Sequence, residues 1–452
     1  MGFSLRFSFQ TNARCLAQLK EKYKIGQLKT TDQTVIACGR PRYFSRLSNF
    51  RSSCLAPEQK LLWLKITTAI ALICGFALSF RLWISSRLFP LSPVSDSLPA
   101  VPFPFDYIWF FVLIGLLLAI IVIAQPRRLI LAFLALAALL SLWDQTRWQP
   151  WFYQYCFMLA AIGLYAWKKP DARNDPKQQS AVRNHEAALN ACRVIVVFTY
   201  FWSGLQKLNS NFVRETWPDI AGPWLHFLPP AVKKVPAGFA LIIPLLEVAI
   251  ALGLITRKFR NVSIALAVAT HIFVLMLLLS SGENAVVWPW NIAMALSVVI
   301  LFWQDKQTGS RNILAVNNAF HALVLLFFAV LPAFSFVDRW DSYLSSALYS
   351  GNTDQAVIYV SPSVIDHLPA AIRPHIWQSS QPFFLDINRW AYGELNVPVY
   401  PEPRIYRRVA EQICTLAGNS SDIRLRILKK PNPFSGLRKS EYYDCDHLDA
   451  IP

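Results

Sequence analysis

Long apolar runs recur along most of this chain and constrain its fold more than any other feature. Each approaches or reaches the roughly 20 residues that an α-helix needs to cross the hydrocarbon core of a bilayer. Inside a bilayer every backbone N–H and C=O group must be paired within the protein, and a helix pairs them within its own segment. The sequence therefore predicts an all-α membrane bundle of about nine spans, at residues 61–83, 105–124, 128–143, 151–167, 187–207, 236–256, 261–281, 286–303 and 312–337.

The composition agrees with a membrane protein and argues against a nucleic-acid-binding one. The chain is 54% hydrophobic and only 16% charged, whereas soluble chains carry about 25% charged residues. The net charge is +17, but no zinc-finger or RNA-binding signature accompanies it. Basic residues in loops next to anionic headgroups explain this charge. We therefore expect the lipid bilayer, and no nucleic acid, as a partner.

The loops between the predicted spans differ in positive charge, which indicates an orientation. The turns at 143–150 and 282–285 carry Arg147 as their only basic residue, while the loop at 208–235 departs mildly from the pattern with three. The loops on the other side are richer in lysine and arginine, at 125–128, 168–183, 257–260 and 304–311. Because cytoplasmic loops collect these residues, we expect the N-terminus in the cytoplasm and the C-terminus outside, in an inner or plasma membrane.

Two further regions flank the predicted membrane domain of residues 61–337. Residues 1–60 are basic and lack a long apolar run. This argues against a cleavable secretory signal and leaves an organelle transit peptide, a poorly ordered cytoplasmic tail or an early start codon. Residues 338–452 contain strand-like runs at 356–360 and 423–428 and a helical stretch at 404–417. They predict a small α+β extracytoplasmic domain.

The eight cysteines show no CxxC motif and no metal-ligand spacing, so the sequence predicts no metal site. Cys414 and Cys445 both fall in the C-terminal region. A disulfide between them and two unpaired thiols are equally compatible with the sequence. An extracytoplasmic location would let a disulfide persist.

Ionisable side chains inside the predicted spans are candidate functional groups, because a charge in hydrocarbon costs about 3 kcal/mol or more. Glu247 and His271 fall near the middle of adjacent spans, where a contact between them is geometrically easy. Such a contact would be either a proton-handling pair or a structural hydrogen bond. His321, also at membrane depth, is expected to be a structural histidine.

Lys207 ends the apolar run VIVVFTYFWSGL and needs its own explanation. It is either an anchor that reaches water at the interface or a functional group at the edge of the membrane. Straight-helix geometry puts it about 15 Å above Glu247, at 1.5 Å per residue, and so out of contact. Its expected neighbours are Trp288, Trp290 and Asn291 at the outer ends of the following spans, where desolvation would favour a basic amine.

Three segments carry a resemblance to a known family. They are YFWSGLQKLNSNFV, PLLEVAIALGLITRKFRNVSIALAVATHIFVLM and WPWNIAM. Together they resemble the horizontally transferred transmembrane (HTTM) family, which includes vitamin K-dependent γ-carboxylase, and overlap with DoxX/MauE-like redox-associated membrane proteins. The resemblance implies that Lys207 is a base that deprotonates a quinol. The upstream histidine of the carboxylase has only His185 as a counterpart here.

The resemblance implies the first two of three candidate functions, and the ionisable residues at membrane depth suggest the third. The first is a membrane enzyme that acts on a quinone, quinol or lipid ligand, with Lys207, Glu247 and His271 as catalytic residues and Trp288, Trp290 and Asn291 as ligand-binding residues. The second is a non-catalytic component that assists a redox or export system, in contact with another membrane protein. The third is a transporter with a Glu247–His271 proton relay, although no matched repeats support it.

Overall fold

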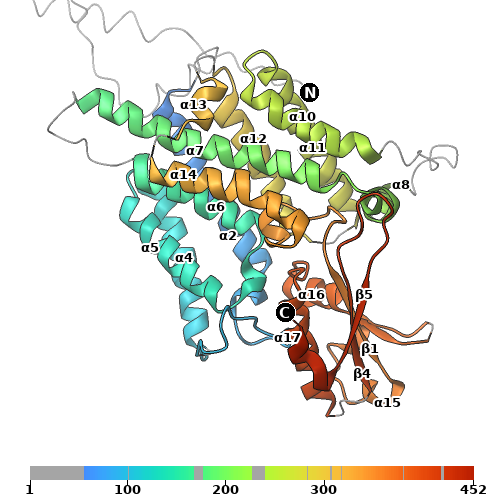
Figure 1. Ribbon diagram of the computed structural model, residues 1–452. Coiled ribbons are helices and arrows are strands. Elements are labelled where there is room, and N and C mark those ends of the chain that lie inside the picture. The colour runs from blue at the N-terminus through green and yellow to red at the C-terminus, as the bar shows by residue number, and fades with distance from the viewer. Residues whose placement is uncertain are drawn as a thin grey trace, which may run out of the picture. The chain divides into compact units, whose positions relative to one another are not determined.

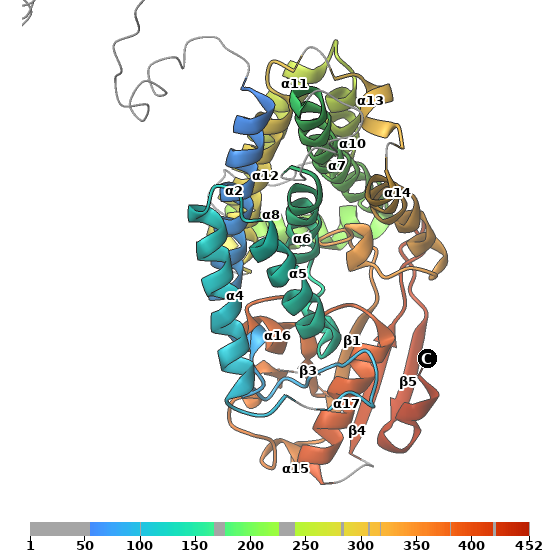
Figure 2. The same cartoon turned by 90° about the vertical axis from the view of Figure 1, so that its left-hand side faces the viewer.

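The computed structural model describes residues 55–99, 101–166, 177–225, 240–281, 284–305, 308–316, 318–379, 381–418 and 422–451. Most of the predicted N-terminal segment, residues 1–54, lies outside these ranges. Residues 54–452 form one compact unit. Within it, helices dominate as far as Val337, and a small sheet follows (Figures 1 and 2).

Five helical segments of the described residues are long and apolar enough to cross a membrane. Helix α7, Lys177–Gln206, contributes its part from Arg183 onward, and the last of the five joins α14 to the helical turns that follow it. The five segments are Pro57–Leu78 in α2, Phe105–Val122 in α4, Arg183–Gln206 in α7, Arg260–Ser280 in α11 and Ala319–Val337. The chain therefore has the character of a helical membrane protein.

Four of the predicted spans form shorter helices. They are α5 (Arg127–Leu142), α6 (Pro150–Ala161), α10 (Ile242–Ile255) and α12 (Val287–Phe302). The prediction of one span over residues 312–337 is wrong at its start. Helix α13 (Ser310–Leu314) ends before this span is complete, and α14 (Ala319–Val324) begins only after Asn318. The Asn318 side chain accepts a hydrogen bond from the His321 amide at 2.8 Å. Asparagine in this capping position starts a new helix.

The C-terminal region folds into a five-stranded antiparallel sheet with helices, as the α+β prediction requires. The strand order is β2-β3-β1-β4-β5, and Ile358 at the centre of β1 pairs with Leu385 of β3 and Leu425 of β4. The strands are β1 (Gln355–Val360), β2 (Ile376–Trp377), β3 (Phe384–Asp386), β4 (Ile423–Leu428) and β5 (Ser440–Asp444). Alternate residues of β4 are buried, which is the two-residue period of a half-buried strand.

Two amphipathic helices accompany the sheet. Helix α16 spans Ile387–Leu395 and α17 spans Pro403–Ala417. A disulfide between Cys414 in α17 and Cys445 after β5 ties α17 to the edge of the sheet. The structure therefore decides between the two alternatives that the sequence left open for these cysteines.

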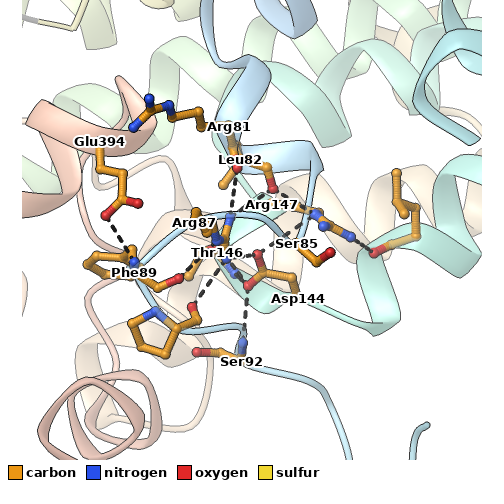
Figure 3. Close-up of polar contacts among 12 residues, drawn as sticks. Arg81, Leu82, Ser85, Arg87, Phe89, Ser92, Asp144, Thr146, Arg147 and Glu394 are labelled. Carbon is orange, nitrogen blue, oxygen red and sulfur yellow. Dashed lines mark hydrogen bonds and ion pairs between the residues drawn. The ribbon is translucent and has the colours of Figure 1, made fainter. Parts of the chain in front are cut away.

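A buried ionic cluster joins the connection after α3 (Phe80–Trp83) to the turn before α6 (Figure 3). Arg87 donates to Asp144 at 2.5 Å, and Arg147 donates to the carbonyl oxygen of Leu82 at 3.0 Å. Glu394 of α16 accepts the backbone amide of Phe89 at 2.9 Å, which fastens the C-terminal domain to this connection. Arg147, expected in an outer turn, is therefore buried rather than exposed to solvent.

Candidate functional site

A cavity of about 390 Å³ lies among α7, α10, α11, α12 and the segment after α7. That segment consists of the π-helical turn η3 (Phe212–Thr216) and α8 (Trp217–Leu225). Most of the lining is apolar. The lining residues are Thr199, Tyr200, Ser203, Lys207, Phe212, Trp217, Ile220, Ile243, Leu246, Glu247, Leu266, Ala269, Thr270, His271, Phe273, Val274, Leu277, Leu278, Val287, Trp290, Asn291, Met294 and Tyr349.

Lys207 and Glu247 form a buried ion pair in the wall of this cavity. The Lys207 Nζ atom lies 3.0 Å from Glu247 Oε1 and 2.8 Å from Oε2, and only 10% and 11% of the two side chains are exposed. Nζ also donates to the side-chain and backbone oxygens of Ser203, at 2.5 and 3.3 Å. The predicted separation of about 15 Å between Lys207 and Glu247 is wrong.

The predicted separation is wrong because the prediction placed the start of this helix too early in the chain. A span from residue 236 puts Glu247 about eleven residues deep, near the middle of the membrane. In the structure the α-helix begins at Ile242, so Glu247 lies in its second turn. Glu247 is thus close to the same end of the bundle as Lys207, which directly follows α7.

Gly204 lets the backbones of α7 and α10 approach closely enough for this pair to form. A Cβ atom on Gly204 would lie 2.6 Å from the Pro244 carbonyl oxygen and 3.0 Å from the Val248 amide nitrogen. Both contacts are with backbone, which cannot move aside as a flexible side chain could. The glycine three residues before Lys207 therefore serves the packing of α7 against α10.

His271 is held by two hydrogen bonds on the opposite nitrogen atoms of its ring. Asn291 donates its amide to the carbonyl oxygen of Val287 at 2.8 Å, so its Oδ1 faces His271 Nδ1, also at 2.8 Å. Nδ1 therefore carries the hydrogen, and Nε2 accepts from the Tyr200 hydroxyl at 2.5 Å. This arrangement fits a neutral imidazole of defined tautomer.

The expected Glu247–His271 contact is replaced by these separate partners. Within the described residues, Glu247 pairs with Lys207, and both ring nitrogens of His271 bind Tyr200 and Asn291. The two predicted residues nevertheless line the same cavity. Within the described residues the expected direct contact between them is therefore not formed, and the proton relay stays a hypothesis.

The two tryptophans expected to bind a ligand differ in position. Trp290 lines the cavity and donates its indole N–H to Gln154 Oε1 at 2.7 Å. Trp288 is absent from the lining, and its indole nitrogen is buried without a hydrogen-bond partner among the described residues. Five of the six predicted site residues thus line the cavity: Lys207, Glu247, His271, Trp290 and Asn291.

His321 and His185, the other two histidines considered from the sequence, do not line the cavity. His321 is fully buried and its Nε2 atom lies 3.0 Å from the carbonyl oxygen of Ile313, a structural contact. His185 lies in α7 twenty-two residues before Lys207, about 33 Å along a helix. It therefore does not supply a histidine beside the lysine.

Several residues that line the cavity are not among the predicted site residues. Tyr200 and Ser203 precede Lys207 by seven and four residues, a helical spacing that places all three on one face of α7. This spacing in the sequence predicts that Tyr200 and Ser203 lie beside Lys207. Tyr349 comes from the C-terminal region, and no local pattern connects it with the membrane helices.

The polar residues around Lys207 connect the end of α7 to the candidate span Ala319–Val337 and to the C-terminal region. Gln206 donates to Ser335 Oγ and accepts from Asn352, both at 2.7 Å. Asn209 donates to the carbonyl oxygen of Ser350 at 2.9 Å. These buried bonds fix the position from which Lys207 reaches Glu247.

Comparison of the chain with protein-family models, with curated proteins and with solved structures found no match. Within the described residues, no cluster of three His, Cys, Asp or Glu side chains could hold a metal ion. The cavity and its polar wall are therefore the basis for assigning a function.

Proposed function

We propose that this chain is a multi-pass membrane protein that binds a lipophilic quinone or quinol in the cavity, with Lys207 as the base. One observation carries the proposal: the Lys207–Glu247 ion pair stands in the wall of a predominantly apolar cavity. Ligand sites combine such walls with a few placed polar groups, and their volumes start at roughly 300 Å³. The volume of about 390 Å³ is within this range.

The lining fits the two chemical parts of such a ligand. Apolar side chains such as Leu246, Phe273 and Val274 would cover the ring and the start of a hydrocarbon tail. Lys207 and the Tyr200–His271 pair offer polar atoms to the ring oxygens. The ring oxygens of a quinone or quinol can form hydrogen bonds with these groups, which a plain hydrocarbon cannot.

In this proposal Glu247 accepts a proton from Lys207, so that Lys207 can act as a base. Transfer of a proton from the ammonium of Lys207 to the carboxylate of Glu247, 2.8 Å away, leaves a neutral amine and a neutral acid. The amine then accepts the proton of the ligand hydroxyl, while the two oxygens of Ser203 hold the nitrogen in place.

The proposal includes the orientation inferred from the loop charges, with about nine spans, a cytoplasmic N-terminus and an extracytoplasmic C-terminus. The Cys414–Cys445 disulfide supports the extracytoplasmic location of the C-terminal region, since disulfides persist in oxidising compartments. The base at the end of α7 then lies at the outer side of the membrane.

A second function is favoured by a different observation. The acceptors around Lys207 Nζ, from Ser203 and Glu247, suffice for all three hydrogens of an ammonium. A pair satisfied in this way also suits a non-catalytic membrane component that assists a redox or export system. In that case the pair fixes α7 against α10, and the cavity holds lipid.

Replacement of Lys207 by arginine distinguishes the proposed enzyme from the non-catalytic component. Arginine retains the positive charge but is too weak an acid to become a neutral base. We expect Lys207→Arg, reconstituted in nanodiscs, to bind a short-chain naphthoquinone or ubiquinone, while its rate of oxidation of the corresponding quinol by added dioxygen, the electron acceptor in the assay, falls by about 100-fold or more. The matched control is Lys258→Met, a change at an exposed lysine in the turn between α10 and α11.

The measurements are calorimetric quinone binding and quinol turnover in the same nanodiscs. Absence of quinone binding by the unmodified chain would exclude the proposed ligand class. Quinone binding with unchanged turnover in Lys207→Arg would instead assign the ion pair to structure and favour the second function.

A further inference from the structure

The turn between β4 and β5 presents two large apolar side chains to the outside. Phe434 is 89% exposed and Leu437 is 76% exposed, although neither belongs to a membrane-spanning helix. We call residues 431–438 the hairpin tip. In β4, which leads into the tip, Ile423, Leu425 and Ile427 are buried. The tip therefore departs from the apolar-inside pattern of its own sheet.

The hairpin tip is internally braced rather than loose. Asn432 Oδ1 accepts from the amides of Phe434 and Ser435, both at 3.0 Å, and the Gly436 amide donates to the Asn432 carbonyl oxygen at 2.9 Å. Gly436 has a φ of +74°, which a residue with a side chain rarely adopts. The turn thus holds Phe434 and Leu437 outward in a defined conformation. Their exposure is therefore a property of the folded turn.

The hairpin tip lies where a candidate membrane span ends. The Ser210 amide, shortly after α7, donates to the Pro433 carbonyl oxygen at 2.8 Å, and Arg214 donates to the Ser435 carbonyl oxygen at 3.4 Å. Figure 1 shows the red hairpin reaching the level of α8, which follows α7. Because the end of a spanning helix marks the membrane surface, the tip is at the depth of the lipid headgroups.

The charge around the hairpin tip suits that depth. Residues 423–440 contain six basic residues and no acidic one. Lys429, Lys430 and Lys439 pair with Asp354, Asp338 and Glu441, and 78% of the Lys439 side chain is exposed. Exposed apolar side chains flanked by basic ones are typical of segments that lie in the membrane interface.

We propose that the hairpin tip inserts Phe434 and Leu437 into the headgroup region of the bilayer that holds α7. The tip is then an interfacial anchor of the C-terminal domain, and the lipid surface is its partner. The hydrogen bond from the Ser210 amide to the Pro433 carbonyl oxygen connects the hairpin tip to the segment just before η3, whose Phe212 lines the cavity. The proposal does not depend on the identity of the ligand in the cavity.

Photo-cross-linking from the hairpin tip tests the proposal. The full chain would carry p-benzoylphenylalanine at position 434 or 437, in nanodiscs of phosphatidylcholine and phosphatidylglycerol. The control position is 377, since Trp377 is 45% exposed in β2 at the opposite edge of the sheet. We expect lipid adducts, detected by mass spectrometry, at positions 434 and 437 and none at 377.

A second measurement uses a chain without a cross-linker. Phe434→Ser with Leu437→Ser should accelerate amide hydrogen exchange at residues 432–438 severalfold in nanodiscs, whereas Trp377→Ser should leave these amides unchanged. Absence of lipid adducts at 434 and 437, or adducts only with a second protein chain, would overturn the proposal. Unchanged exchange in the double variant would also contradict it.

Discussion

The Lys207 ammonium lies 2.8 Å from the Glu247 carboxylate, across the contact between α7 and α10. This one contact joins two candidate catalytic residues that straight-helix geometry keeps apart. It also creates the polar wall of the cavity. Because both side chains are buried, the pair has consequences for stability that are measurable without any ligand.

The first prediction is a strong coupling between Lys207 and Glu247. Removal of one partner leaves a buried charge unpaired, which costs about 3 to 5 kcal/mol. We therefore expect Lys207→Met and Glu247→Gln each to lower the melting temperature markedly. The double variant should be more stable than the sum of the two changes implies. Thermal unfolding of the four proteins in detergent measures this coupling, and additive effects would contradict a direct pair.

The second prediction concerns the close approach at Gly204. A methyl group there would collide with the backbone of α10 at Pro244 and Val248, so Gly204→Ala should destabilise the protein by about 1 to 3 kcal/mol. A Cβ atom on Gly115 in α4 would meet no other atom within 4 Å, so Gly115→Ala should be neutral or stabilising by up to about 1 kcal/mol. Equal melting temperatures of the two variants would contradict this prediction, because they would show that α10 moves aside to accommodate the methyl group.

The third prediction concerns the disulfide of the C-terminal domain. Cys414 and Cys445 are 31 residues apart, and closing a loop of this length stabilises a fold by about 3 to 4 kcal/mol in the chain-entropy model. Cys414→Ser should therefore lower the melting temperature of the oxidised protein. Cys74→Ser is the control, since Cys74 of α2 is a free thiol. Thiol alkylation before and after reduction should add the label at Cys414 and Cys445 only after reduction.

The fourth prediction is a pH dependence that originates at Glu402. Burial, and then the negative charge of Asp341, raise the pKa of Glu402 from 4.5 to about 7. Between these values the folded protein holds a proton that the unfolded chain releases, so stability falls as pH rises from 4.5 through about 7. The total loss is at most about 3 kcal/mol.

Glu402→Gln isolates that contribution. The amide keeps an oxygen acceptor for the Ser342 backbone amide, which Glu402 binds at 2.8 Å, but it does not titrate. We expect the melting temperature of the unmodified protein to decrease more between pH 5 and pH 8 than that of the variant. Parallel decreases in the two proteins would assign the pH dependence to other groups.

Helix and strand formation were largely accessible from the sequence. The apolar run before Lys207 predicted α7, and the alternation in residues 423–428 predicted β4, since both patterns repeat within one segment. The spacing of Tyr200, Ser203 and Lys207 also determined one polar face of α7, because residues three and four apart are neighbours on any α-helix.

Contacts between side chains of different helices and strands could be identified only from the tertiary structure. Whether Lys207 meets Glu247 depends on where α10 begins and on how closely Gly204 lets the two helices pack. Tyr349 reaches the cavity from the C-terminal region, and Cys414 meets Cys445 only after α17 lies against the sheet. Sequence periodicity determines which face a residue occupies within its element, whereas a contact between elements depends on their ends and separation, which only packing decides.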